Sequence, residues 1–216
     1  MQKIMTQNIL DSRAICRADC YAQRFMRPGR YSYHILPAHT ALLTDDRPFV
    51  IEVEKADDRR EMAQHNIQVK ANKASYVPDN RELKIAVGDL VLWNCASADA
   101  PPFAVIGDQE FFDSSRLTNE CGYSHAFGMP GEYRWRDAYG SDISGVITVS
   151  DPECKCDNDV RKWREKLAEG TVVMIADGGA EPSKVSVVVG QTVFFAVVTS
   201  KGISITDERI LEKARG

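Results

Sequence analysis

The sequence contains no long apolar run and few of the short motifs that mark common enzyme classes. No apolar stretch approaches the about 20 residues that cross a bilayer as a helix, so we expect no membrane span. The sequence also lacks a phosphate-binding P-loop, a dinucleotide fingerprint and the G-x-S-x-G nucleophile turn. Only four histidines occur, and none stands in an H-x-H pair. Because these motifs are absent, the fold has to be inferred mainly from the alternation of apolar residues typical of β-strands and from the residues that favour turns.

Charge and the first residues of the sequence restrict the partners and the compartment. The net charge of −4 argues against a general nucleic-acid or anionic-membrane binder. The opening MQKIMTQNIL lacks the apolar core of a secretory signal. We therefore expect a cytoplasmic location, or a periplasmic or secreted one if a signal has been removed. The six cysteines are compatible with either compartment.

The middle of the chain is rich in β-strand patterns. Residues 83–87, 90–93 and 145–149 concentrate or alternate Val, Ile, Leu and Trp, as half-buried strands do. Gly88-Asp89 separates the first two runs as a tight turn, and Pro130-Gly131 leads into another strand at 132–136. Many short strands with turn residues between them predict an all-β sandwich rather than an α/β fold.

Four phrases in this region resemble the cupredoxins, the blue-copper β-sandwiches. They are V-G-D-L-V-L-W-N from Val87, F-D-S from Phe112, S-H-A-F-G-M-P-G-E-Y-R-W from Ser124 and G-V-I-T-V from Gly145. The resemblance covers about 80 residues and implies two Greek-key sandwiches once the internal repeat is considered. Two-domain relatives of this kind often form trimers, so the resemblance also suggests a homo-oligomer.

The resemblance places the type-1 copper ligands at positions where this chain has other residues. A blue-copper site needs two imidazoles and a thiolate, with a weak axial thioether. Phe103 follows Pro101-Pro102 where the first His is expected, and Asp137 stands where the Cys is expected. Neither His nor Met follows Asp137 in its loop. We therefore expect a cupredoxin-like scaffold without type-1 copper.

The chain also repeats itself with an offset of 102 residues. Asp11-Ser12, Pro28-Gly29 and Tyr31 recur as Asp113-Ser114, Pro130-Gly131 and Tyr133, and Gly88 recurs as Gly190. We expect residues 66–150 to form one continuous unit and residues 1–54 to pair with 170–216 as a circularly permuted, discontinuous one. The alternative is an exchange between chains, which would build an oligomer.

Residues 55–65 and 151–169 are the expected linkers. The first is charged and compatible with a short helix. In the second, Val160, Trp163 and Leu167 fall on one face of a predicted helix at 157–169, which Asp157 or Asn158 would cap and Gly170 would end.

Two sets of residues are candidates for a site. His34 and His39 lie near the place of the family's C-terminal copper loop, so they are candidate ligands for copper or zinc at a remodelled site. The alternative is a surface loop with two unrelated histidines. Phe103, Trp135, Asp137 and Tyr139 would surround a vacated metal pocket that takes a small polar ligand. His125 is expected to be structural, and His65 shows no companion in the sequence.

Three functions remain open at this level. The first is a structural, assembly or interaction module with protein partners, built on a sandwich that has lost its copper. The second is a metal-binding carrier or oxidoreductase that uses His34 and His39. The third is a small-molecule enzyme with its pocket between the two units, where clefts favour ligands. Cys154-Lys155-Cys156 lacks the two-residue spacer of zinc knuckles and thioredoxin-type motifs. We expect an exposed thiol pair there, or disulfides from these cysteines to others in the chain.

Overall fold

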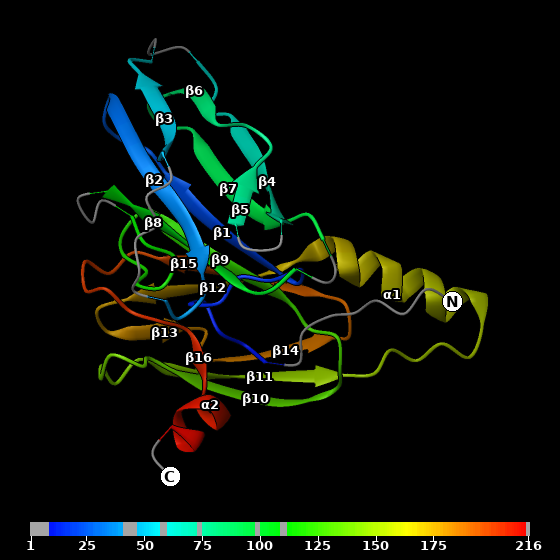
Figure 1. Cartoon of the computed structure of the whole chain (residues 1–216). Coiled ribbons are helices and arrows are strands. Elements are labelled where there is room, and N and C mark those ends of the chain that lie inside the picture. Colours follow the sequence, from blue (N-terminus) through cyan, green and yellow to red (C-terminus); the bar gives the residue numbers. More distant parts are fainter. Residues whose placement is uncertain are drawn as a thin grey trace.

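A computed structural model of the chain is built mostly of β-strands, arranged as several sheets in a sandwich-like fold (Figure 1). It describes residues 9–40, 47–56, 60–72, 75–97, 100–108 and 112–214. Among these residues, no helix combines the length and the apolar character needed to cross a bilayer. The prediction of an all-β sandwich-like fold is therefore confirmed at this coarse level.

The strands fall into two successive groups, which we call the N-terminal half and the C-terminal half. The N-terminal half contains β1 (Asp19–Arg24), β2 (Gly29–Pro37), β3 (Phe49–Glu54), β4 (Gln64–Asn72), β5 (Ser75–Pro78), β6 (Glu82–Ala86), β7 (Leu90–Cys95) and β8 (Phe103–Gly107). The C-terminal half contains β9 (Cys121–Ala126), β10 (Gly131–Arg136), β11 (Ser144–Ser150), α1 (Asp157–Glu169), β12 (Thr171–Ala176), β13 (Gly179–Glu181), β14 (Lys184–Val188), β15 (Thr192–Val197), β16 (Thr206–Asp207) and α2 (Glu208–Lys213).

Both halves contribute to one long sheet. Its strand order is β13-β12-β15-β9-β1-β7-β4-β5, so that the C-terminal half supplies the first four strands and the N-terminal half the last four. Each half also has a four-stranded sheet of its own, β6-β3-β2-β8 or β14-β11-β10-β16. Counted outward from the middle of the long sheet, β1-β7-β4-β5 of the N-terminal half correspond strand for strand to β9-β15-β12-β13 of the C-terminal half.

A pseudo-two-fold axis passes between β1 and β9, where the two halves meet. These strands pair antiparallel with Tyr21 opposite Tyr123, and the two tyrosines are separated by the repeat offset of 102. On either side of this tyrosine pair, each residue of β1 lies opposite the repeat equivalent of another residue of β1. The interface of a symmetric dimer shows the same relation. The internal repeat of the sequence appears in the structure as this approximate symmetry.

The strand pairings differ from the predicted combination of residues 1–54 with 170–216. β3 pairs with β6 and β1 pairs with β7, so the first three strands combine with residues 82–107 instead. The continuous unit expected at 66–150 is likewise divided, because β11 pairs with β14 and β9 pairs with β15. The repeat offset of 102 is the same for either combination, so it does not distinguish them.

Each four-stranded sheet packs its apolar face against the long sheet. In the N-terminal half, Trp93 of β7 contacts Tyr33 of β2, with their ring centroids 5.6 Å apart. In the C-terminal half, Phe195 of β15 contacts Trp135 of β10 at 5.5 Å. The strands alternate buried and exposed residues because each sheet has one face toward this core.

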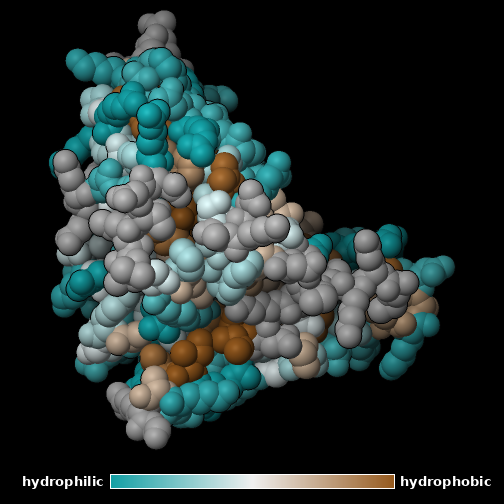
Figure 2. Space-filling model, in the orientation of Figure 1, coloured by the Kyte–Doolittle hydropathy of each residue, from teal (hydrophilic) through white to brown (hydrophobic). Residues whose placement is uncertain are grey.

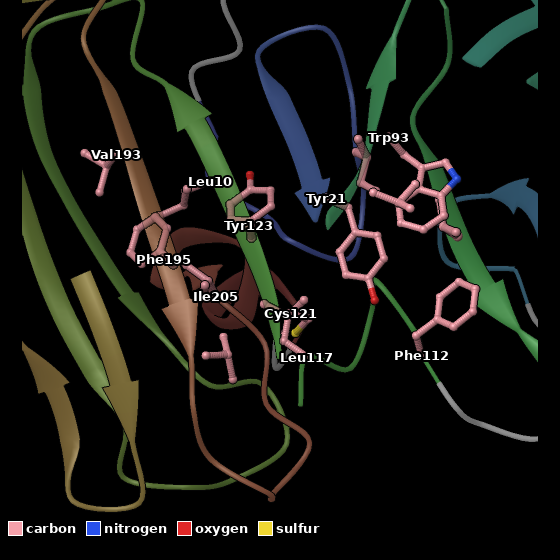
Figure 3. Packing of buried hydrophobic residues seen from close by; sticks show 14 of the residues in the cluster. Leu10, Tyr21, Trp93, Phe112, Leu117, Cys121, Tyr123, Val193, Phe195 and Ile205 are labelled. Atoms are coloured by element: carbon pink, nitrogen blue, oxygen red, sulfur yellow. The ribbon is translucent and has the colours of Figure 1, made fainter. Parts of the chain in front are cut away.

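Short segments before β1 and β9 cross between the halves. Leu10 is fully buried, and its carbonyl accepts a hydrogen bond from the N–H of Asp207 in the C-terminal half. Its repeat equivalent, Phe112, stacks on Trp93 in the N-terminal half at 5.7 Å. Figure 3 shows Leu10 beside Phe195 and Phe112 beside Trp93. Each half therefore receives a core side chain from the segment that leads into the other.

The second linker forms the predicted helix. α1 spans Asp157–Glu169 and Gly170 follows it, as expected, although the N-cap is Cys156 rather than Asp157 or Asn158. The indole N–H of Trp163 donates to the carbonyl of Val189 at 2.9 Å, which anchors the helix to the turn before β15. In the first linker, residues 60–63 form no helix and β4 begins at Gln64.

Candidate functional site

The structure gives the two candidate metal-ligating histidines separate acidic partners. His34 lies on β2, and its Nε2 is 3.4 Å from Oδ1 of Asp108. His39 follows β2, and its Nε2 is 3.5 Å from Oδ2 of Asp11. Within the described ranges, no group of three or more His, Cys, Asp or Glu side chains is placed to hold a metal ion.

The predicted pocket residues lie in different sheets. Phe103 belongs to β8 and packs on Tyr76, with ring centroids 5.7 Å apart, whereas Trp135 belongs to β10 and packs on Phe195. Phe103 and Trp135 are both buried, and Tyr139 is half exposed. Phe103 was expected in the same unit as Asp137, and the observed strand pairing places it in the other half.

Asp137 is committed to its own loop. Its carboxylate accepts hydrogen bonds from the backbone N–H groups of Tyr139 at 3.1 Å, Ser141 at 3.0 Å and Ser204 at 2.8 Å. Burial alone would raise the pKa of Asp137, but these bonds outweigh it and hold the pKa below its ordinary value. The carboxylate therefore fixes the turn after β10 and joins it to the segment that contains Ser204.

An apolar groove of about 430 Å³, which we call the junction groove, opens between the two halves. Its volume falls in the range of ligand-binding clefts. Figure 2 shows hydrophobic surface in the part of the molecule where Figure 1 places β16 and α2. The groove is lined by Ile9, Asp11, Ala14, Pro37, Ala38, His39, Tyr76, Pro101, Pro102 and Ile210.

The polar groups of the junction groove are mostly satisfied within the chain. Asp11 is 4% exposed and accepts two side-chain hydrogen bonds from Arg13, at 2.9 and 3.2 Å. The hydroxyl of Tyr76 donates to the carbonyls of Pro101 and Pro102, both at 3.2 Å. The imidazole of His39 is 55% exposed and lies at the rim, beside the Asp11 carboxylate. Among the described residues, a ligand would therefore meet mostly apolar walls and this His39–Asp11 pair.

The backbone of His39 is in the left-handed region, with φ of 60°. Non-glycine residues adopt this conformation uncommonly, and such backbones concentrate at ligand clamps and other functional sites. The turn holds the imidazole beside Asp11, at the rim of the groove.

The pseudo-symmetry identifies the counterpart of the junction groove in the other half. Asp11 corresponds to Asp113, and Ala14 corresponds to Arg116. The N–H of Ala14 donates to the carbonyl of Asp11 at 3.1 Å, and the N–H of Arg116 donates to that of Asp113 at 3.2 Å. The two turns are therefore alike in backbone and differ in the side chain that faces the groove.

Larger side chains stand at the equivalent positions of the C-terminal half. The Arg116 guanidinium lies 5.3 Å from the centre of the Tyr139 ring, and its aliphatic part covers Gly202. The hydroxyl of Tyr139 donates to the carbonyl of Ser115 at 3.0 Å. Proline occupies the equivalent of Tyr139, at Pro37. The bridges Ile15–Phe103 and Leu117–Ile203 shift the offset to 100 in the segment before β8 and β16, so Pro102 is the equivalent of Gly202. Among the described residues, the same fold thus carries large side chains at these positions in one half and small ones in the other.

A second polar cluster lies at the start of β4. His65 was expected to have no companion, but its Nε2 is 2.9 Å from Oδ2 of the fully buried Asp89. Asp89 also accepts two hydrogen bonds from Arg60, at 3.0 and 2.9 Å. The cluster ties the start of β4 to the turn before β7, which is a structural role.

His125 lies in the core at the junction of the halves. Its Nδ1 is 2.6 Å from Oδ1 of Asp19, and the same oxygen accepts from the hydroxyl of Tyr123 at 2.6 Å. The ring is fully buried, and its Nε2 has no hydrogen-bond partner among the described residues. The cluster therefore joins β1 to β9 through side chains as well as through the strand ladder.

The groove contains residues that the sequence did not single out, above all Ala14 and Ile210. Their apolar side chains carry no chemical signature, and they are far apart in the sequence. The sequence signal that could have pointed to these positions is the repeat alignment. It aligns Ala14 with Arg116 and Pro37 with Tyr139, so each pair combines a small side chain with a large one.

Comparisons with protein families, with curated proteins and with solved structures find no match to this chain.

Proposed function

We propose that the protein is a non-catalytic interaction module that holds an apolar segment of a partner protein in the junction groove. One observation carries the proposal: the groove lies where the N-terminal half has Ala14 and Pro37, whereas the C-terminal half has Arg116 and Tyr139, in contact with each other, at the equivalent positions. The small side chains that border the groove are therefore a property of this half's sequence and not a requirement of the fold.

The lining of the groove supports an apolar peptide segment as the occupant. Pro37, Pro101 and Pro102 offer rigid apolar surface. Because these side chains are already ordered, little conformational entropy is lost when a ligand binds to them. The imidazole of His39 can form a hydrogen bond with a peptide group of the segment. Burying each large apolar side chain contributes about 1.5–3 kcal/mol. A segment that buries three or four of them is expected to bind in the micromolar range or more weakly.

The test gives the groove the large side chain that the other half has at the equivalent position. Peptides selected from a random display library on the purified protein would be labelled, and their affinity measured by fluorescence anisotropy. Ala14→Arg should weaken binding at least about tenfold, a change of about 1.4 kcal/mol. Ala14→Ser keeps the groove open and should bind as the natural chain does. Equal binding by Ala14→Arg, or no selected peptide, would reject the proposal.

The cupredoxin resemblance is part of this proposal. A sandwich that has Phe103 and Asp137 in the places of copper ligands retains a rigid scaffold for a binding groove. The packing of Phe103 on Tyr76 supports this, because Tyr76 itself lines the groove.

Self-association is a second candidate, and the outer face of the long sheet favours it. On β12 the outward side chains Val172 and Met174 are 56% and 51% exposed. The same face of β4 carries the polar residues Asn66 and Gln68. Soluble antiparallel sheets usually show polar residues on the solvent face, so an apolar outer face in one half indicates a covering partner.

A homo-oligomer would bury this face, and sedimentation can detect it. Sedimentation velocity of the natural chain should show a species larger than one chain. Val172→Glu with Met174→Glu should shift it to the monomer. A monomeric natural chain across the accessible concentrations would eliminate self-association, including the trimer that the resemblance suggests.

A further inference from the structure

The cysteines divide into two groups by accessibility. Burial raises the pKa of Cys20 and of Cys121 to about 12. Burial also raises the pKa of Cys16 and of Cys95 above the ordinary value. Cys154 and Cys156, in contrast, are exposed, and none of the six forms a disulfide. The thiols open to solvent are therefore two residues apart, in the segment before α1.

The segment between the two exposed thiols is held in place by the helix that follows. Cys156 is the N-cap of α1, with extended backbone at φ of −149°. Oδ2 of Asp159 accepts hydrogen bonds from the backbone N–H of Lys155 at 3.1 Å and of Cys156 at 3.2 Å. Figure 1 shows α1 projecting from the sheets, and both cysteines of the preceding segment are exposed. Less backbone freedom is thus lost when both sulfurs bind one ion than if this segment were not held by these hydrogen bonds.

Charge around the thiols favours a cation. Four carboxylates lie between residues 151 and 159, and Lys155 is the one basic residue there. The carboxylates are Asp151, Glu153, Asp157 and Asp159. This negative surface attracts cations and repels anionic thiol reagents such as glutathione disulfide. Soft thiolate ligands select soft metal ions.

We propose that Cys154 and Cys156 bind one thiophilic monovalent cation, Cu(I) being the probe, through their two sulfurs. Each thiol loses its proton as its sulfur–metal bond forms, so two protons are released and the metal keeps its oxidation state. The described residues hold no group of three or more metal-ligating side chains, and a linear two-thiolate site needs only two. A structural zinc site needs four ligands, so Zn²⁺ is expected to bind weakly here.

Competition with a coloured Cu(I) chelator under anaerobic conditions tests the site. The natural chain should remove one equivalent of Cu(I) from the chelator. Cys154→Ser and Cys156→Ser should each weaken binding at least about a hundredfold, because one thiolate alone is a poor ligand. Serine is a favoured N-cap, so Cys156→Ser keeps α1 intact and its helix content can be checked by circular dichroism.

Two control variants separate this site from others. Cys95→Ser removes a half-buried thiol and should leave the equivalent of Cu(I) bound. His34→Ala with His39→Ala should also leave it bound, which distinguishes this site from one built on those histidines. Retention of Cu(I) by the Cys154→Ser, Cys156→Ser double variant would overturn the proposal. So would a natural chain that removes no Cu(I), or one that holds Zn²⁺ as tightly.

Discussion

Asp89 shows how much of the N-terminal half depends on a single side chain. Besides Arg60 and His65, its carboxylate accepts hydrogen bonds from the backbone N–H groups of Ala63 at 2.9 Å and Ala86 at 3.1 Å. Burial alone would raise the pKa of Asp89, but these bonds outweigh it and hold the pKa well below its ordinary value. In the other half, Gln191 occupies the equivalent position and accepts from the N–H of Val188.

Replacing Asp89 by Gln should lower the free energy of unfolding by about 2–3 kcal/mol at neutral pH, since it leaves Arg60 without its buried partner. The low pKa of Asp89 stabilises the fold above the ordinary carboxyl pKa of about 3.9, and this stabilisation is lost as the pH falls below that value. Asp89→Gln should therefore unfold with a flatter acid dependence. Urea denaturation across acid pH measures both effects, and Glu132→Gln, in an exposed pair, should change little.

The sequence could reveal some of these residues and not their partners. His39 was a candidate metal ligand because it lies near the place of the family's C-terminal copper loop, and the structure instead places it at the rim of the junction groove. The link between His65 and Asp89 was missed because 24 residues separate them and only the parallel pairing of β4 with β7 brings them together. Ala14 was missed because an apolar side chain in a groove has the same sequence signal as one in a core.

At the scale of elements, the repeated Asp-Ser phrase is a connection between halves. The hydroxyl of Ser12 accepts the N–H of Ile205 at 3.0 Å, and the hydroxyl of Ser114 accepts the N–H of Val105 at 2.9 Å. Both serines are fully buried. Each segment therefore supplies the acceptor for a backbone N–H of the half into which it crosses.

Replacing either serine by Ala should destabilise the fold by about 1–3 kcal/mol, because a buried backbone N–H then lacks an acceptor. Ser150→Ala is the matched control, since Ser150 is exposed and its hydroxyl bond is long, at 3.4 Å. Its effect should be within about 0.5 kcal/mol. Urea denaturation measures all three variants, and a neutral Ser12→Ala would show that Ile205 finds another acceptor.

The positions of several strands, including β7 and β11, and of α1 followed from the sequence, whereas the strand partners did not. Alternating apolar residues and turn residues mark a strand locally, as at β7 and β11, and the spacing of Val160, Trp163 and Leu167 marks α1. Pairing depends on contacts between distant segments. The repeat offset fixed which segments are alike and said nothing about which of them pair.

At the scale of the whole molecule, the two halves depend on each other. Residues 1–108 alone would lack Phe112, which packs on Trp93, and would expose the edge of β1 that β9 covers. We expect this fragment to show no cooperative unfolding as a monomer, when followed by circular dichroism and by the dispersion of its amide NMR signals. A monomeric fragment with a cooperative transition would show that the halves are independent.

The crossing of Leu10 and Phe112 has a consequence for the origin of the chain. Because each half receives its neighbour's arm across a pseudo-two-fold axis, a chain of one repeat could close the same structure only as a dimer with exchanged arms. Duplication and fusion of such a gene would have made the exchange intramolecular. It would also have freed the two sites to diverge, so that one acquired arginine and tyrosine where the other has alanine and proline.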